Sequence, residues 1–211
     1  MLEEIFKKLD VYRSDVTDYV DSEIFDEKQN ELNVELPLSM IEFYRHFGND
    51  EEVMMSFDDF GTAEDITILY NALVFGEKYQ SIGLLGIQLN ELEHEHQVVS
   101  WYPYDVDEWV VESANEEIFF LGRASWQILN TLPSVARVGM KLDAFVKIVG
   151  EELQYLSDKT LHQIGDIIPV IGEGILGCYF TYSEELYLGT KDGDDVLRKY
   201  EKSLGLDLDW I

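Results

Sequence analysis

The chain has 211 residues, the size of one large domain or of one domain with an appendage. Hydrophobic residues make up 46% and aromatic residues 13%, which is enough for a packed core and excludes intrinsic disorder. The 43 acids and 15 bases give a formal net charge of −28. Nucleic acids and anionic membranes are bound through Lys and Arg, so this composition excludes both as partners of the protein's own surface.

The sequence predicts a cytoplasmic protein. Cys178 is the single cysteine, so an intramolecular disulfide is excluded. Residues 1–8 lack the basic region and the apolar stretch of a signal peptide. The most apolar segment, residues 167–180, is interrupted by Pro169 and several glycines and is shorter than the ~20 residues that span a bilayer.

The negative charge is concentrated in the middle of the chain. Residues 46–122 carry 17 acids and one base, Lys78. One interpretation is a solvated acidic surface that keeps the protein soluble by repulsion. The other is a patch that steers a basic partner, and composition alone leaves both open.

Apolar spacing predicts helices in the first 50 residues. Apolar residues recur at helical spacing over 2–9, and a second helix is expected over 21–32, ending near Asn33. Pro37 precedes the best-defined helical pattern, residues 39–48, and we expect Gly48 to end that helix as its C′ residue.

From residue 66 onward, short aromatic and β-branched runs predict an antiparallel meander, followed by a return to helix. Residues 66–75 indicate extended structure, or a short helix followed by a strand. The further predicted elements are strands at 80–87, 97–102, 109–112 and 117–121, helices at 125–132 and 142–156, a hairpin at 177–181 and 185–188, and a helix at 194–204 that ends at Gly205.

The predicted class is therefore α+β, with a central antiparallel sheet flanked by helices. We place the core in residues 1–150. Residues 151–211 are expected to form a C-terminal hairpin-plus-helix extension, packed on the same domain.

Motifs for catalysis or for a metal are weak. His94 and His96 form a His-x-His pair in a very polar stretch, which favours an exposed loop over a zinc site. Cys178 lies in an apolar run typical of a packing residue. Adjacent carboxylates are frequent, as 43 acids make inevitable, so no glycosidase-type pair stands out. We expect no catalytic residue, no metal and no cofactor; a hydrolase that uses a carboxylate cluster or the two histidines is the remaining alternative.

Aromatic residues stand beside acids in residues 101–112. Strand aromatics usually pack a sheet, but aromatics rimmed by carboxylates also suit a partner rich in Arg and Lys. The candidate partner-binding residues are Trp101, Asp105, Asp107, Glu108, Trp109 and Glu112.

Several segments resemble the SUKH superfamily. The stretch LPLSMIEFYRHFG (residues 36–48) is similar to its opening pattern of a Leu-Pro pair, a helix with an aromatic cluster, and a glycine. Residues 73–83 resemble a strand of longer bacterial members, with Tyr79 where these carry Asn, and residues 142–145 and 197–210 resemble later segments. The resemblance implies a non-enzymatic α+β binding module, since the superfamily shares no catalytic residue. Its members include bacterial immunity proteins that neutralise toxins, many of them nucleases, and regulators of fungal cell-wall synthesis.

Charge and resemblance together predict an immunity protein that occludes a basic, nuclease-type toxin domain. The alternative is an intracellular regulatory or scaffold protein of the same fold with no toxin partner. The oligomeric state, the identity of the partner and the face that binds it stay open.

Overall fold

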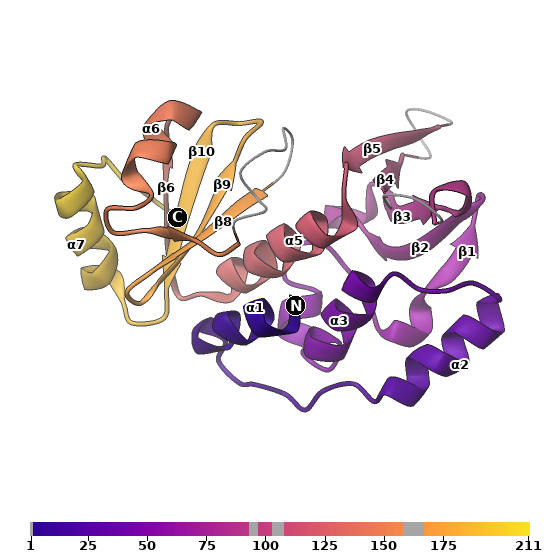
Figure 1. Cartoon of the computed structure of the whole chain (residues 1–211). Coiled ribbons are helices and arrows are strands. Elements are labelled where there is room, and N and C mark those ends of the chain that lie inside the picture. Colours follow the sequence, from indigo (N-terminus) through magenta and orange to yellow (C-terminus); the bar gives the residue numbers. More distant parts are fainter. Residues whose placement is uncertain (1, 93–96, 103–107, 158–166) are drawn as a thin grey trace.

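The computed structural model describes residues 2–92, 97–102, 108–157 and 167–211. It confirms the α+β class, but with two antiparallel sheets in place of one central sheet (Figure 1). The helices are α1 (Leu2–Leu9), α2 (Ser22–Leu32), α3 (Leu38–Phe47), α4 (Glu51–Met54), α5 (Glu116–Thr131), α6 (Leu142–Ile148) and α7 (Asp194–Leu204). None of the helices within these ranges is long and apolar enough to cross a bilayer.

The first sheet is a meander in which each strand pairs with the next one along the chain. Its strands are β1 (Thr67–Leu69), β2 (Ala72–Glu77), β3 (Leu84–Gln88), β4 (Val98–Trp101) and β5 (Trp109–Ser113). The second sheet has the order β11-β6-β10-β9-β8-β7. Its strands are β6 (Ser134–Gly139), β7 (Gln154–Tyr155), β8 (Ile167–Gly172), β9 (Ile175–Phe180), β10 (Glu185–Thr190) and β11 (Asp209–Trp210).

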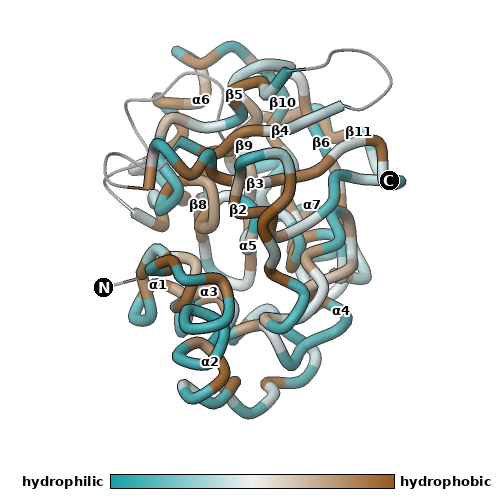
Figure 2. Tube along the Cα trace, turned by 90° about the vertical axis from the view of Figure 1, so that its right-hand side faces the viewer, coloured by the Kyte–Doolittle hydropathy of each residue, from teal (hydrophilic) through white to brown (hydrophobic). Residues whose placement is uncertain are grey.

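Helix α5 lies between the two sheets and belongs to the larger core (Figure 1). That core joins α1, α3 and α5 to one face of the first sheet and to residues of β8 and β9. A second core lies between the opposite face of the second sheet and helices α6 and α7. Figure 2 shows the apolar residues running along the strands, whereas α2 is mostly hydrophilic.

Helix ends follow the local sequence with one exception. Asn33 and Gly205 take the left-handed conformation that ends α2 and α7, as their positions predict. Gly48 instead keeps a right-handed backbone, with φ of −60°. Glycine is required there for space, because a Cβ would lie 2.9 Å from Cγ2 of Val20 and close to the Tyr44 carbonyl oxygen.

Two predicted elements are wrong. Residues 117–121 are not a strand but the first turns of α5, where the Asn115 side chain accepts a hydrogen bond from the Ile118 amide. Burial between two sheets removes the polar face by which a helix is normally recognised. The helix predicted over 142–156 ends at Ile148, and Gly150, with φ of +101°, turns the chain toward β7.

The expected division after residue 150 passes through the second sheet. Strand β6, at residues 134–139, pairs with β10 and β11 from the end of the chain. The two sheets therefore separate in sequence at the end of α5, near residue 132. No strand is predicted from the sequence at β6, which has six residues, or at β11, which has two.

One buried amide holds α5 against the segment that leads into the first sheet. Oε1 of Gln127 accepts hydrogen bonds from the amides of Phe57 and Asp58, at 3.1 and 3.0 Å. Its Nε2 donates to the carbonyl oxygens of Met54 and Asp58, at 3.2 and 2.7 Å. A buried amide that satisfies four backbone groups fixes the position of residues 54–58 on the helix.

Replacing Gln127→Leu keeps the volume of this side chain and removes the side-chain partner of the Phe57 and Asp58 amides and of the Asp58 carbonyl oxygen, while the Met54 carbonyl oxygen keeps the Phe60 amide. We expect the free energy of unfolding to fall by about 2–5 kcal/mol, measured by chemical denaturation. The matched control is Gln154→Leu at an exposed position of β7, which should change stability by less than about 0.5 kcal/mol. Equal stability of the two variants would contradict the assigned role.

Candidate functional site: an acidic and aromatic sheet face

The first sheet has one face in the core and one face that is partly open. Leu73, Phe75, Leu85 and Ile87 point into the core beneath the sheet. Successive side chains alternate between the faces of a strand, and a bulge between Val74 and Gly76 of β2 brings Glu77 to the face opposite Phe75. We call this second surface the outer face.

Strand register places a row of five residues across the outer face. Asp59 forms a bridge with Glu77, and Glu77 is paired with Leu84. Leu84 is paired in turn with Trp101, and Trp101 with Trp109. Directly paired residues share a face of the sheet. The row, which we call the acidic–aromatic row, therefore runs from two carboxylates through a leucine to two indole rings.

A β-turn and a glycine hold the aromatic end of the row in place. Tyr70 lies in the turn between β1 and β2, and its ring contacts that of Trp101. Nε1 of Trp109 donates a hydrogen bond to the Tyr70 carbonyl oxygen at 3.2 Å. A Cβ on Gly86 would lie 3.5 Å from the Trp109 ring, so the indole rests over a strand position without a side chain.

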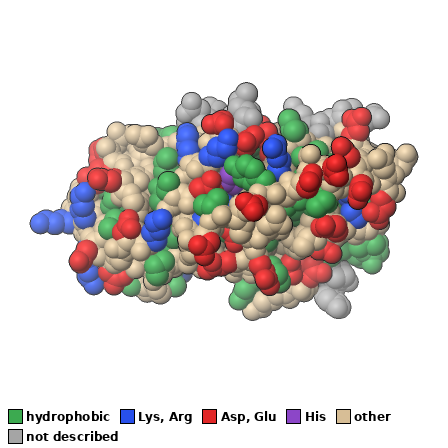
Figure 3. Space-filling view, turned by 90° about the horizontal axis from the view of Figure 1, so that it is seen from below, with side chains coloured by type: hydrophobic (Ala, Val, Ile, Leu, Met, Phe, Trp, Pro, Cys, Tyr) green, Lys and Arg blue, Asp and Glu red, His purple; other side chains and the backbone are tan. Residues whose placement is uncertain are grey.

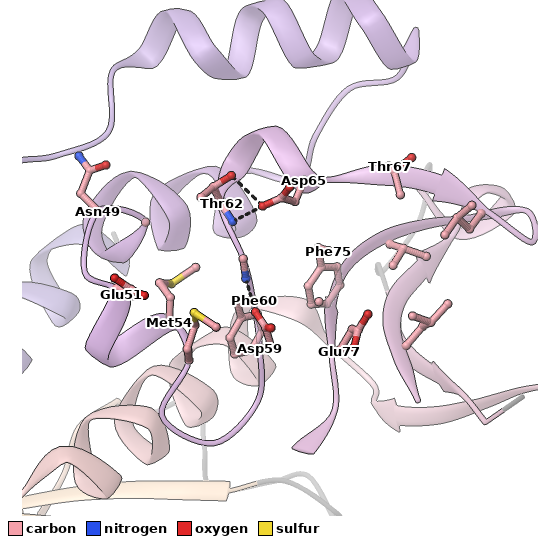
Figure 4. A pocket seen from close by; sticks show the side chains of 17 residues that line it. Asn49, Glu51, Met54, Asp59, Phe60, Thr62, Asp65, Thr67, Phe75 and Glu77 are labelled. Carbon is pink, nitrogen blue, oxygen red and sulfur yellow. Dashed lines mark hydrogen bonds between the residues drawn. The ribbon is translucent and has the colours of Figure 1, made fainter. Parts of the chain in front are cut away.

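A groove of about 760 Å³ opens at the acidic end of the row, between α4 and the strands β1 to β3 (Figure 4). Its carboxylates are Glu51, Asp59, Asp65 and Glu77. Its apolar lining includes Met54, Met55, Leu69, Val74 and Leu84. Figure 4 shows Glu51, Asp59 and Glu77 distributed along the groove from α4 to β2.

Local hydrogen bonds keep two of the groove carboxylates in position. The Thr62 amide and hydroxyl both donate to Oδ2 of Asp65 at 2.8 Å, which holds the pKa of Asp65 below its usual value. Oδ1 of Asp59 accepts a hydrogen bond from the Gly61 amide at 2.9 Å. Hydrogen bonds from backbone amides favour the ionised form of a carboxyl group. Asp65 is therefore an anion at neutral pH.

No lysine or arginine is among the described residues that line the groove. The one base of residues 46–122, Lys78, lies elsewhere. Its Nζ is 2.7 Å from Oε1 of Glu112 and 2.5 Å from the Tyr102 hydroxyl, and its side chain is 17% exposed. Figure 3 shows, on the face it displays, Asp and Glu side chains gathered over the half that carries α2 and the first sheet. Lys78 thus neutralises an internal acid and contributes no free positive charge to this half.

Glu112 lies inside that network and does not project from the surface as a partner-binding residue would. Its Oε1 also accepts a hydrogen bond from Ser100 at 2.6 Å, and Arg123 lies 3.8 Å from its Oε2. Burial acts to raise the pKa of Glu112, but the hydrogen bonds and charges of Lys78, Ser100 and Arg123 outweigh it and lower the pKa. Glu112 therefore serves the fold.

The other candidate residues divide into three groups. Trp101 and Trp109 both lie on the acidic–aromatic row. Glu108 is exposed at the entrance to β5. Asp105 and Asp107 lie outside the described residues. The structure adds Asp59 and Glu77, which sequence reasoning missed because only strand register shows that they share a face with the tryptophans, and it adds Asp65 in the lining of the groove.

The metal and nucleophile candidates of the sequence can be followed only in part. Within the described ranges, no three His, Cys, Asp or Glu residues are placed to hold a metal ion. Cys178 is fully buried, and burial raises the pKa of its thiol. A thiol that stays protonated is a poor nucleophile. His94 and His96, the one metal hypothesis of the sequence, lie outside the described residues.

No protein-family model, curated protein or solved structure matches this chain. The α+β class rests on the structure itself. Membership of the SUKH superfamily stays a prediction that rests on the quoted sequence segments.

Replacing Lys78→Met removes the cation beside Glu112, so the pKa of Glu112 should rise. In the wild type the pKa of Glu112 is lower in the folded state than in the unfolded state, where it is about 4.5. Ionised Glu112 therefore stabilises the folded protein above that pH, and this stabilisation is lost as the pH falls through the folded pKa. NMR titration of the Glu112 carboxyl carbon measures the change. Lys202→Met, at an exposed position of α7, is the matched control. The assigned pair is wrong if both variants leave the Glu112 titration unchanged.

Proposed function

We propose that this chain is a non-enzymatic protein-binding module that neutralises a basic, nuclease-type toxin domain by occluding its cationic surface. The observation that carries the proposal is the acidic–aromatic row beside a groove that has four carboxylates and no described cation in its lining. The proposal places the protein in the cytoplasm, where such a toxin would act.

The outer face combines the two features that bind Arg and Lys side chains. Indole faces attract cations, by about 0.5–1 kcal/mol at exposed sites and by more when water is excluded. Carboxylates at the other end of the row, Asp59 and Glu77, supply charge-assisted hydrogen bonds. Met55, which lines the groove and is 53% exposed, offers flexible apolar surface for the aliphatic part of a long basic side chain.

Net charge supports rapid association with such a partner. A nuclease must present a cationic surface to bind phosphates, and a net charge of −28 attracts that surface over a distance. Electrostatic steering of this kind raises association rates by about 10–10³-fold at low salt. Once bound, the acidic face covers the cations that the nucleic acid would occupy, so inhibition requires no chemical step.

Affinity capture from the source cell tests the proposal. We expect one basic protein to be retained at about 50 mM salt and released at about 500 mM salt, because the distance over which exposed charges interact falls from about 10 Å at 0.1 M to about 3 Å at 1 M salt. Co-expression should then protect cells from the captured protein. A partner that is neutral and insensitive to salt would instead favour a scaffold role.

Charge reversal on the row tests the face itself. Glu77→Lys should weaken binding of the captured protein by about tenfold at low salt, and by less at high salt, in a surface-binding assay. The matched control is Asp207→Lys, which makes the same change in net charge at an exposed position of the second half. Equal losses for the two variants would show that only net charge matters and would remove this face from consideration.

A further inference from the structure

Strand β5 forms one edge of the first sheet. The sheet order ends with β4-β5, and in the described part of the chain no strand pairs with the other side of β5 (Figure 1). Two consecutive residues of β5 are exposed: Val110 by 42% and Val111 by 55%. Because strand residues alternate, these two valines lie on opposite faces of the edge.

The other sheet edges are shorter. Strand β1 has three residues, and β7 and β11 have two each, whereas β5 has five. Proteins usually protect an edge strand with charges, prolines or very short length, because its free amides and carbonyl groups pair readily with another chain. The centre of β5 carries β-branched apolar residues, which favour strand pairing. It is therefore the described edge best suited to accept a further strand.

We propose that an extended basic segment of the partner adds to β5 as a sixth strand of the first sheet. This inference rests on the proposed function, since it names how the same acidic and aromatic face meets its partner. Main-chain hydrogen bonds to β5 would supply affinity, and the side chains beside the row would supply specificity.

The register of β5 defines the chemistry of the added strand. A residue opposite Trp109 would join the acidic–aromatic row, where a basic side chain can lie against the indole. Residues opposite Val110 and Val111 would cover apolar surface on the two faces, so apolar side chains fit there. The expected pattern is two adjacent apolar residues followed or preceded by a basic one, with further basic residues at the ends.

Charge decides between a basic segment and a second copy of this chain. Pairing β5 with β5 of another copy would bring together two molecules that each carry −28 and place the two Glu108 side chains at the ends of the paired strands. Like charges at an interface oppose association. A basic partner segment meets the same edge with attraction.

Peptide binding tests the proposal without altering the protein. The probe is an acetylated and amidated peptide of sequence Arg-Val-Val-Arg-Arg, compared with two versions that are N-methylated at one or the other set of alternate residues. In an added strand only one set of amides faces β5, so one methylated peptide should lose at least about tenfold in affinity while the other binds as well as the parent. Hydrogen exchange should show new protection of amides in residues 109–113.

Any one of three results would overturn strand addition: equal affinities of the two methylated peptides, no new protection of amides in β5, or no binding of the parent peptide. The proposed function fails on a different result, namely equal effects of Glu77→Lys and Asp207→Lys on the captured protein. If Glu77→Lys weakens binding of the captured protein but the two methylated peptides bind equally well, the partner is basic but does not dock on the edge strand.

Discussion

The fold depends on the burial of α5 between two sheets. Residues on all sides of this helix are buried, including Phe120, Ile128 and the polar Gln127. A helix with no solvent-facing stripe is stable only when both of its sides are covered. Neither sheet would have a complete core without it, because the larger core draws on the first sheet and on β8 and β9 together.

The same helix positions the candidate site from behind. Gln127 fixes residues 54–58, and Arg123 lies 2.9 Å from Asp58. Those residues lead directly into Asp59, the first member of the acidic–aromatic row. Arg123 also approaches the network around Glu112, whose members Ser100 and Tyr102 flank Trp101 in the sequence. The outer face is therefore supported through side chains that never reach it, and a partner would meet a surface that is already in place.

Local signals in the sequence were sufficient for the fold class and for most helices. Helices α1, α2, α3 and α7 follow from apolar spacing and from residues such as Asn33 and Gly205. The start of α5 was misread as a strand, because a short apolar run in a buried helix lacks periodicity. The presence of two sheets was not predictable, since β6 finds its partners about 50 residues later in the chain.

The candidate site was predictable in composition but not in geometry. The concentration of acids and the tryptophans at 101 and 109 were visible in the sequence. Which acids accompany them was not, because Asp59 and Glu77 join the tryptophans only through the pairing of successive strands. The same limit explains Glu112, which looked like a surface acid until its pairing with Lys78 was seen.

The internal position of Lys78 has a consequence for the cost of recognition. Where a resident lysine or arginine already pairs with a carboxylate, a partner's cation must displace it, and the lost ion pair offsets the new one. The described ion pairs include neither Asp59 nor Glu77, while the cation closest in sequence is committed to Glu112. An incoming Arg or Lys at these two carboxylates would break no described ion pair, so its cost is limited to the water removed from the charges and the ordering of its own side chain.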